Sequence, residues 1–128
     1  MPTAAAAIAA GFAAALRVRG VPVTFVRGED EISIPLAILG RTEWEAPQRD
    51  GYVAKFVSVD VLFPPTDLVL DDALIEPEQG DRIRWTLAGV VRTYELLGQP
   101  GIPPARIDND RTFWRCHTKL VTEEEEPA

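Results

Sequence analysis

The chain has 128 residues, the size of one domain, and 46% of them are hydrophobic, enough for a modest core. Its formal net charge of -7 disfavours direct nucleic-acid binding, which needs clustered Lys and Arg side chains. One cysteine, Cys116, leaves no intramolecular disulfide framework and is typical of a reducing compartment. The Ala-rich start has no basic residues before it and is too short to span a membrane, so we expect a cytosolic protein.

Residues 3–18 are predicted to form an α-helix. Alanine is the best helix former, and Thr3 is a suitable N-cap. Gly20 and Pro22 are expected to end the helix. The helix carries one narrow apolar stripe, which we expect to pack on its own domain or on a neighbouring subunit. That stripe consists of Ile8, Phe12 and Leu16.

From residue 21 onward the hydrophobic period changes from four to two, which indicates strands. Residues 23–27 and 31–38 are predicted to form a hairpin around a Gly28 turn. Pro35 cannot donate to a sheet ladder, so the second strand is expected at an edge or to be bulged there. Residues 40–51 combine Gly, Pro and charges without a clean period, and we expect a long loop.

The remaining chain is predicted to be a series of strands separated by turns. Residues 52–63 alternate well, and residues 68–75 are expected to form a short strand or one helical turn. The most informative turn is Pro77 to Asp81, where Gly80 can adopt a positive φ before the next strand. The following strands are expected at 81–87, 91–97 and 111–121, with a Pro-rich connection at 100–110.

These elements predict one mainly β domain over residues 1–128. One N-terminal helix at 3–18 and six or so strands within 21–121 indicate a small antiparallel β-barrel or sandwich of the α+β class. The acidic end, residues 122–128, carries four glutamates and is expected to be disordered.

Nothing in the sequence indicates catalysis, a cofactor or a metal. His117 is the only histidine, and Cys116 beside it would point to the opposite face of a strand, so the two cannot readily share a metal. We expect one of the pair to be buried and the other to be on the surface. The acidic pairs Asp71-Asp72 and Asp108/Asp110 fit turns better than calcium loops. We therefore expect no enzyme activity and no cofactor.

Trp44 lies within the expected long loop, where an exposed tryptophan would be costly. It either folds back onto the barrel or anchors a protein interface, since tryptophan is enriched at such interfaces. Trp85 and Trp114, on expected strands, are predicted to be core or barrel-wall residues.

The order of these elements resembles the head–tail joining proteins of long-tailed phages, the lambda FII-like group of head completion or stopper proteins. The resemblance covers about residues 8–121 and rests on the Ala-rich helix, the hairpin, the 40–51 loop and one further unit. That unit is Gly80-Asp81-Arg82-Ile83, followed by Gly89 and by Tyr94-Glu95-Leu96. The final strand and the glutamate-rich end depart from the lambda-type pattern.

The resemblance implies a structural virion assembly protein, found in the virion and in the host cytoplasm during assembly. It would form a ring of six copies between the portal-capped capsid and the tail, with portal or adaptor and tail-terminator proteins as partners. DNA would pass through the ring without specific binding. The resemblance implies interface contacts in the 40–51 region and on the helix, for which we select Phe12, Leu16, Trp44, Arg49 and Tyr52.

Two other readings remain open at this point. The chain could be another β-rich phage part, such as a tail completion or baseplate component. It could also be a barrel that binds a small ligand or a peptide, which would need an apolar mouth with convergent polar groups.

Overall fold

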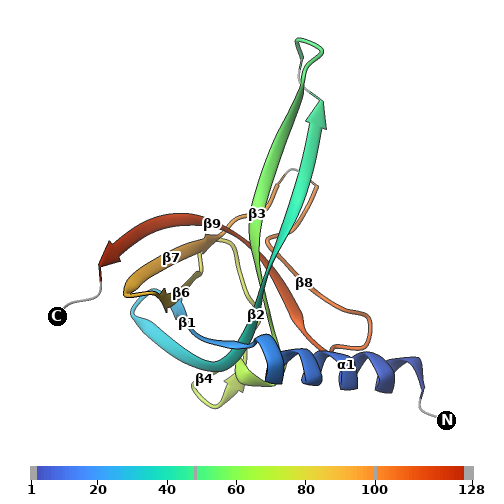
Figure 1. Cartoon of the computed structure of the whole chain (residues 1–128), viewed down its shortest axis with the longest axis vertical. Helices are drawn as coiled ribbons and strands as arrows, with labels where there is room; N and C mark the ends of the chain where they lie inside the picture. Colours follow the sequence, from blue (N-terminus) through green and yellow to red (C-terminus); the bar gives the residue numbers. More distant parts are fainter. Residues whose placement is uncertain (1–2, 48, 100, 126–128) are drawn as a thin grey trace.

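The computed structural model describes residues 3–47, 49–99 and 101–125, without the side chains of Trp44, Ala46, Pro47, Ala54 and Phe56. It shows one helix followed by a mainly β body (Figure 1). The mainly β class with one N-terminal helix is confirmed, and of the two expected architectures the structure is a barrel. No helix within the described residues is long and apolar enough to cross a membrane.

The barrel is closed by six antiparallel strands in the order β3-β2-β1-β6-β7-β9, with β9 returning to β3. Closure matters because it pairs strand edges that would otherwise stay open. The six strands are β1 (Val21–Arg27), β2 (Asp30–Pro47), β3 (Val53–Phe63), β6 (Arg82–Leu87), β7 (Val90–Leu96) and β9 (Trp114–Glu125).

Three short strands and one turn of 3-10 helix complete the fold. The strand β8 (Ala105–Ile107) adds to the first part of β9, next to β7 along the same edge. A separate small hairpin lies between β3 and β6. It is formed by β4 (Val69–Leu70) and β5 (Ala73–Leu74), and η1 (Pro65–Asp67) precedes it.

The barrel interior is filled by one apolar cluster drawn from all six strands. Trp85 stacks on Tyr94 with ring centroids 4.2 Å apart, and Phe25 meets Phe63 edge-on. Trp85 and Trp114 are buried, as the sequence predicted. The cluster members with 0% exposure are Phe25, Ile34, Ala37, Val61, Phe63, Leu68, Ile83, Leu96 and Cys116.

The corner at Gly80-Asp81 ties β6 to β1. Gly80 has a φ of +93°, and its N–H donates to the carbonyl of Leu96. The Asp81 carboxylate accepts from both Nε and Nη2 of Arg27, at 3.0 and 2.7 Å, and from the backbone N–H of Glu78 at 2.8 Å. This bidentate pair raises the pKa of Arg27 and fixes the direction in which β6 starts.

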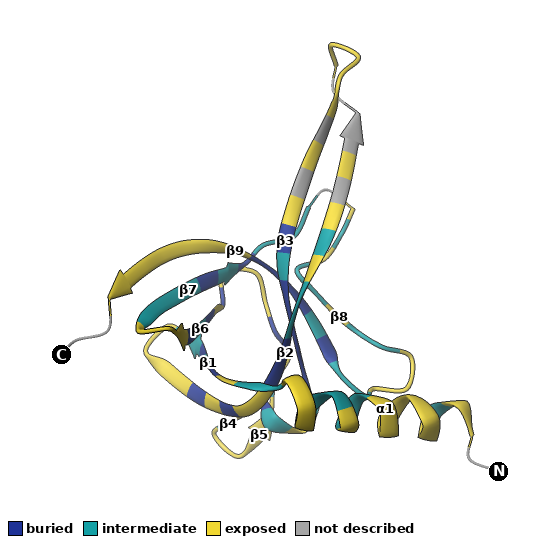
Figure 2. Ribbon diagram, in the orientation of Figure 1, coloured by how far each residue is buried: buried dark blue, intermediate teal, exposed yellow. Residues whose placement is uncertain are grey.

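The helix α1 (Ala4–Arg19) begins where the sequence predicts. Thr3 caps it by accepting from the N–H of Ala6 at 3.1 Å. No residue of α1 is buried, and the helix lies along the outside of the barrel against β2, with its N-terminal half projecting beyond it (Figures 1 and 2). A register shift in the pairing of β1 with β2 lies beside Pro35, where a bulge was one of the two expectations.

The prediction of a loop over residues 40–51 is wrong for residues 40–47, while residues 49–51 do form a turn and residue 48 lies outside the described part. β2 runs on to Pro47 and pairs with β3 without interruption from Ile38↔Leu62 to Pro47↔Val53, so that only residues 48–52 separate the two strands. Gly and Pro obscured an alternation of charged residues at 41, 43 and 45 with less polar ones at 42, 44 and 46. Pro47 is tolerated because it lies at the end of a strand with an open edge.

The prediction of a disordered end is wrong for residues 122–125. They belong to β9 and pair with β7 from Thr93↔Thr122 to Val90↔Glu125. Arg92 of β7 binds Glu123 at 3.1 Å, which offsets part of the repulsion among the glutamates. Residues 126–128 lie outside the described part of the chain.

Candidate assembly site

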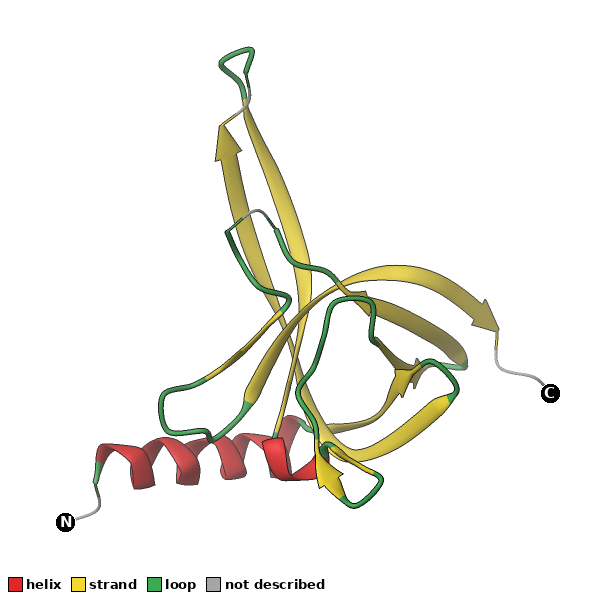
Figure 3. Ribbon diagram, turned by 180° about the vertical axis from the view of Figure 1, so that it is seen from behind, coloured by secondary structure: helices red, strands yellow, loops and turns green. Residues whose placement is uncertain are grey.

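The most conspicuous feature of the surface is a two-stranded arm, which we define as residues 42–58. Between Thr42↔Ser58 and Pro47↔Val53, β2 and β3 pair with each other and, in the described residues, with no other strand. Figures 1 and 3 show this ribbon projecting from the barrel from two opposite sides. Six paired positions at about 3.4 Å per residue give it a reach of roughly 20 Å.

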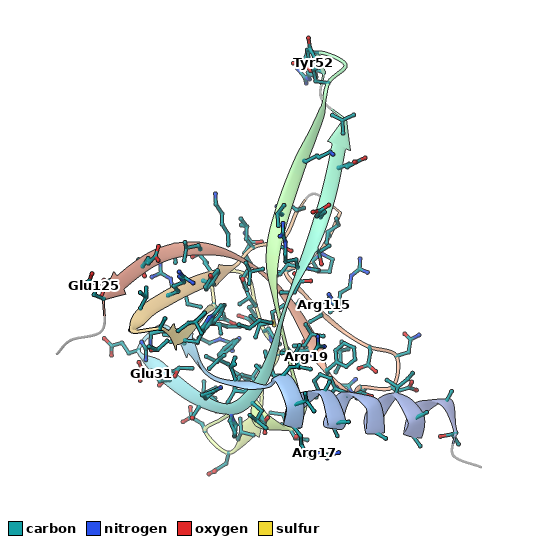
Figure 4. The ribbon with its side chains drawn as sticks, viewed as in Figure 1. Arg17, Arg19, Glu31, Tyr52, Arg115 and Glu125 are labelled. Carbon is teal, nitrogen blue, oxygen red and sulfur yellow. The ribbon has the colours of Figure 1, made fainter. Side chains whose placement is uncertain are left out.

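The arm presents side chains and backbone groups that the barrel does not use. Tyr52 near its tip is 75% exposed, and Val53 and Val57 are 57% and 53% exposed (Figure 4). Both strands of the arm have an outer edge with unpaired N–H and C=O groups in the described structure. Exposed apolar side chains on an open strand edge form a surface suited to pairing with another protein.

The base of the arm is held by a buried carboxylate. Asp60 of β3 is fully buried and accepts hydrogen bonds from Thr42 of β2 and from Ser58 at 2.7 Å. Arg115 donates to it at 2.8 Å, and Nδ1 of His117 lies 2.9 Å from it; both belong to β9. One side chain thus joins the three strands that meet where the arm leaves the barrel.

These partners keep Asp60 ionised. Burial alone would raise the pKa of this carboxyl, but the hydrogen bonds from Thr42, Ser58, His117 and Arg115 outweigh it and hold the pKa below its ordinary value. A buried charge with several hydrogen-bond donors is stable in place and costly to unpair. The cluster therefore fixes the direction of the arm.

The structure places Cys116 and His117 on opposite faces, as predicted, but both are buried. Cys116 belongs to the barrel core, where burial raises its pKa. His117 lies on the outer face of β9, where its ring contacts Asp60, and its backbone N–H donates to the carbonyl of Pro104. In the described residues no three His, Cys, Asp or Glu side chains are grouped to hold a metal ion.

The five residues selected from the sequence do not form one site. Arg49 and Tyr52 lie exposed at the tip of the arm. Trp44 belongs to β2 within the arm, but its side chain lies outside the described part. Phe12 contacts Phe113 of the same chain, with ring centroids 4.8 Å apart, and Leu16 is half-buried on the same helix.

The Asp60 cluster was not found from the sequence. The available signal was Asp60 in an otherwise apolar, alternating strand, at a position whose neighbours on one face are Ser58 and Leu62. A polar pair at i and i+2 inside such a strand indicates that polar groups meet on that face of the sheet. The partners on β9 lie more than 50 residues away and could not be assigned from the sequence.

Residues 3–125 match the sequence model of a family described as phage head-tail joining protein. Among curated proteins, none matches the sequence significantly. The match spans the helix, the whole barrel, the arm and β9 to its last residue.

Proposed function

The chain belongs to the family of phage head-tail joining proteins, and from this premise we propose that it is a structural subunit of the ring between the portal-capped head and the tail. In this proposal six copies assemble below the portal, contact head-side and tail-side proteins, and leave a channel through which DNA passes without specific binding. The role requires no catalysis.

The observation that carries the proposal is the arm. A connector subunit has to contact several neighbours at once, and a ribbon reaching roughly 20 Å from a closed barrel supplies such contacts. The barrel supports the role as a scaffold, since its interior is filled by its own apolar cluster. That filled interior gives no support to a small-ligand barrel.

The net negative charge of the chain also suits a protein that lines a channel for DNA. A net charge of -7 repels phosphates, so DNA can slide past without being retained.

The test is head–tail joining with purified protein. Heads and tails of the encoding phage, prepared without this protein, should be joined by the full chain, as counted by negative-stain microscopy. A variant in which Asn-Gly replaces residues 43–57 keeps Thr42, Ser58 and Asp60, and should fold but fail to join. Tyr52→Ala should lower joining roughly tenfold. An aromatic side chain that becomes buried in an interface contributes more than about 1 kcal/mol to binding.

The matched control is Leu74→Ala. Leu74 is 66% exposed on β5, away from the arm, so its loss should leave joining unchanged. If the full chain itself joins no particles, the proposed role is wrong. If the variant without the arm joins as well as the full chain, the arm is not the contact surface.

A further inference from the structure

A groove runs between α1 and the outer face of the barrel. Its volume is about 420 Å³, and its floor is apolar, with Phe12 and Phe113 in contact at one side. Three arginines from three different elements also line it, and none of its lining residues is acidic. These are Arg19 of α1, Arg41 of β2 and Arg115 of β9.

The three arginines that line the groove have guanidinium N–H groups available to bind a further anion. Arg19 is exposed and forms no ion pair within the described residues. Arg41 lies 3.8 Å from Glu43, but both side chains are about 70% exposed, so this pair is weak. Arg115 uses Nη1 for Asp60 and remains 40% exposed, which leaves other guanidinium donors free to bind. In a chain of net charge -7, such a local positive excess indicates an acidic occupant.

The chain carries a matching segment at the end of β9. Residues 119–125 are exposed throughout (Figure 2), and the pairing of β9 with β3 stops at Thr118, so one edge of this segment is open. Leu120 and Val121 are 42% and 38% exposed. Glu124 and Glu125 form no ion pair within the described residues.

The two surfaces cannot meet within one molecule. Figure 4 places Glu125 at one side of the barrel and Arg19 and Arg115 toward the opposite side. Glu125 is also held there by its pairing with Val90 of β7. Contact between them therefore requires a second copy, and a head-to-tail contact of this kind closes into a ring when the rotation allows.

We propose that the groove of one copy receives the β9 end of the next, with Glu125 against the arginines and Leu120 on the apolar floor. Leu120 and Glu125 share one strand face, because their partners Tyr94 and Val90 share a face of β7, and Glu124 adds to the local negative charge. With one bulged residue between them, Leu120 and Glu125 lie about four strand steps apart, roughly 13 Å. This inference rests on the proposed ring and names the two surfaces that join its subunits. Because the contact is ionic, it weakens with salt.

The test uses two charge-reversed full-length chains, R19E/R41E and E124R/E125R. Self-association is measured by sedimentation velocity at low and high ionic strength. The unaltered chain should associate, and each variant alone should associate roughly tenfold more weakly, because attraction becomes repulsion. A mixture of the two variants should recover association, since each reversed surface then meets a complementary one.

The controls are Arg17→Glu and Glu29→Arg. Arg17 is in the same last turn of α1 but does not line the groove, and Glu29 is an exposed acid in the β1–β2 turn. Neither should change association, and all variants should keep the melting midpoint. An unaltered chain that stays monomeric, or a mixture that does not recover, overturns the inference.

The head–tail joining assay distinguishes a failure of this inference from a failure of the proposed connector role. If both charge-reversed variants join heads to tails as well as the full chain, the interface is wrong while the connector role stands. If only R19E/R41E is defective and the mixture is not rescued, the groove binds a different anion, DNA phosphate included, and the β9 end is not its occupant.

Discussion

A single buried residue, Asp60, sets the geometry of the arm. Replacing it with Asn leaves Arg115 and His117 without their carboxylate and places amide hydrogens against donors. We expect Asp60→Asn to lower the free energy of unfolding by roughly 3 kcal/mol at pH 7. Urea unfolding followed by tryptophan fluorescence measures it.

The same substitution predicts a pH dependence. The pKa of Asp60 is lower in the folded state, so its contribution to stability is present above the unfolded pKa of about 4. It is lost as the pH falls through the folded pKa. The gap in stability between the unaltered chain and Asp60→Asn should therefore be constant near neutrality and shrink below about pH 4.

Two further aspartates bear on this measurement. Asp108 contributes equally to both proteins, and Asp110 provides the control. Burial would raise the pKa of Asp108, but bonds from the backbone N–H groups of Phe113 and Thr112 lower it, so Asp108 adds acid sensitivity to both proteins. The difference between the two proteins isolates Asp60. Asp110→Asn, at an exposed position, should change stability little at any pH. If the difference in unfolding free energy between the two proteins grows as the pH falls, Asp60 is not an ionised residue that stabilises the fold.

At the scale of elements, the docking of α1 depends on one close approach. The backbone of Gly20 is extended, with a φ of -68° that any residue adopts, so glycine is not required for its conformation. It is required for space, because a Cβ there would lie 2.3 Å from the carbonyl oxygen of Leu16 and 3.0 Å from Cβ of Leu36. The sequence predicted the end of the helix correctly but could not show this contact.

Gly20→Ala should therefore push α1 away from β2. We expect a loss of about 1–3 kcal/mol, the usual range for overpacking, and faster trypsin cleavage at Arg17 and Arg19. Gly11→Ala is the matched control, since a Cβ at Gly11 meets nothing within 4 Å. That substitution should stabilise the helix by up to about 1 kcal/mol. Equal cleavage rates for the two variants would show that α1 is not fixed through Gly20.

At the scale of the whole molecule, local pattern predicted the barrel but not the arm. Alternation located the strands, and Gly80-Asp81 marked a corner that the Arg27 pair does fix. The arm was missed because its stability does not come from a buried face, which is the signal that alternation reports. The burial of His117 was missed because Asp60, which its ring contacts, lies 57 residues away in the sequence. The arm is formed by the consecutive strands β2 and β3, so only the second error concerns segments far apart in the sequence.

This difference between barrel and arm predicts two levels of stability. Barrel strands pair on both sides around a shared core, whereas an isolated two-stranded ribbon is marginal in water. In hydrogen exchange, amides of Phe25, Val61 and Ile83 should open only with global unfolding. Paired amides of residues 43–57 should exchange faster by roughly three orders of magnitude, because the ribbon opens without disturbing the core.

The Asp60→Asn variant tests this difference in exchange rate between the barrel and the arm. It should accelerate exchange most at Thr42, Ser58 and their neighbours, since these pairs lose their shared carboxylate. Exchange at the tip of the arm should change little, because it is already fast. Arm amides as slow as those of the barrel would mean that the ribbon is stabilised by contacts other than its own pairing, and that it is not a free element awaiting a partner. A ribbon that is ordered at its base and loose at its tip can adapt to a neighbour while keeping its direction, as assembly on a preformed ring of partners requires.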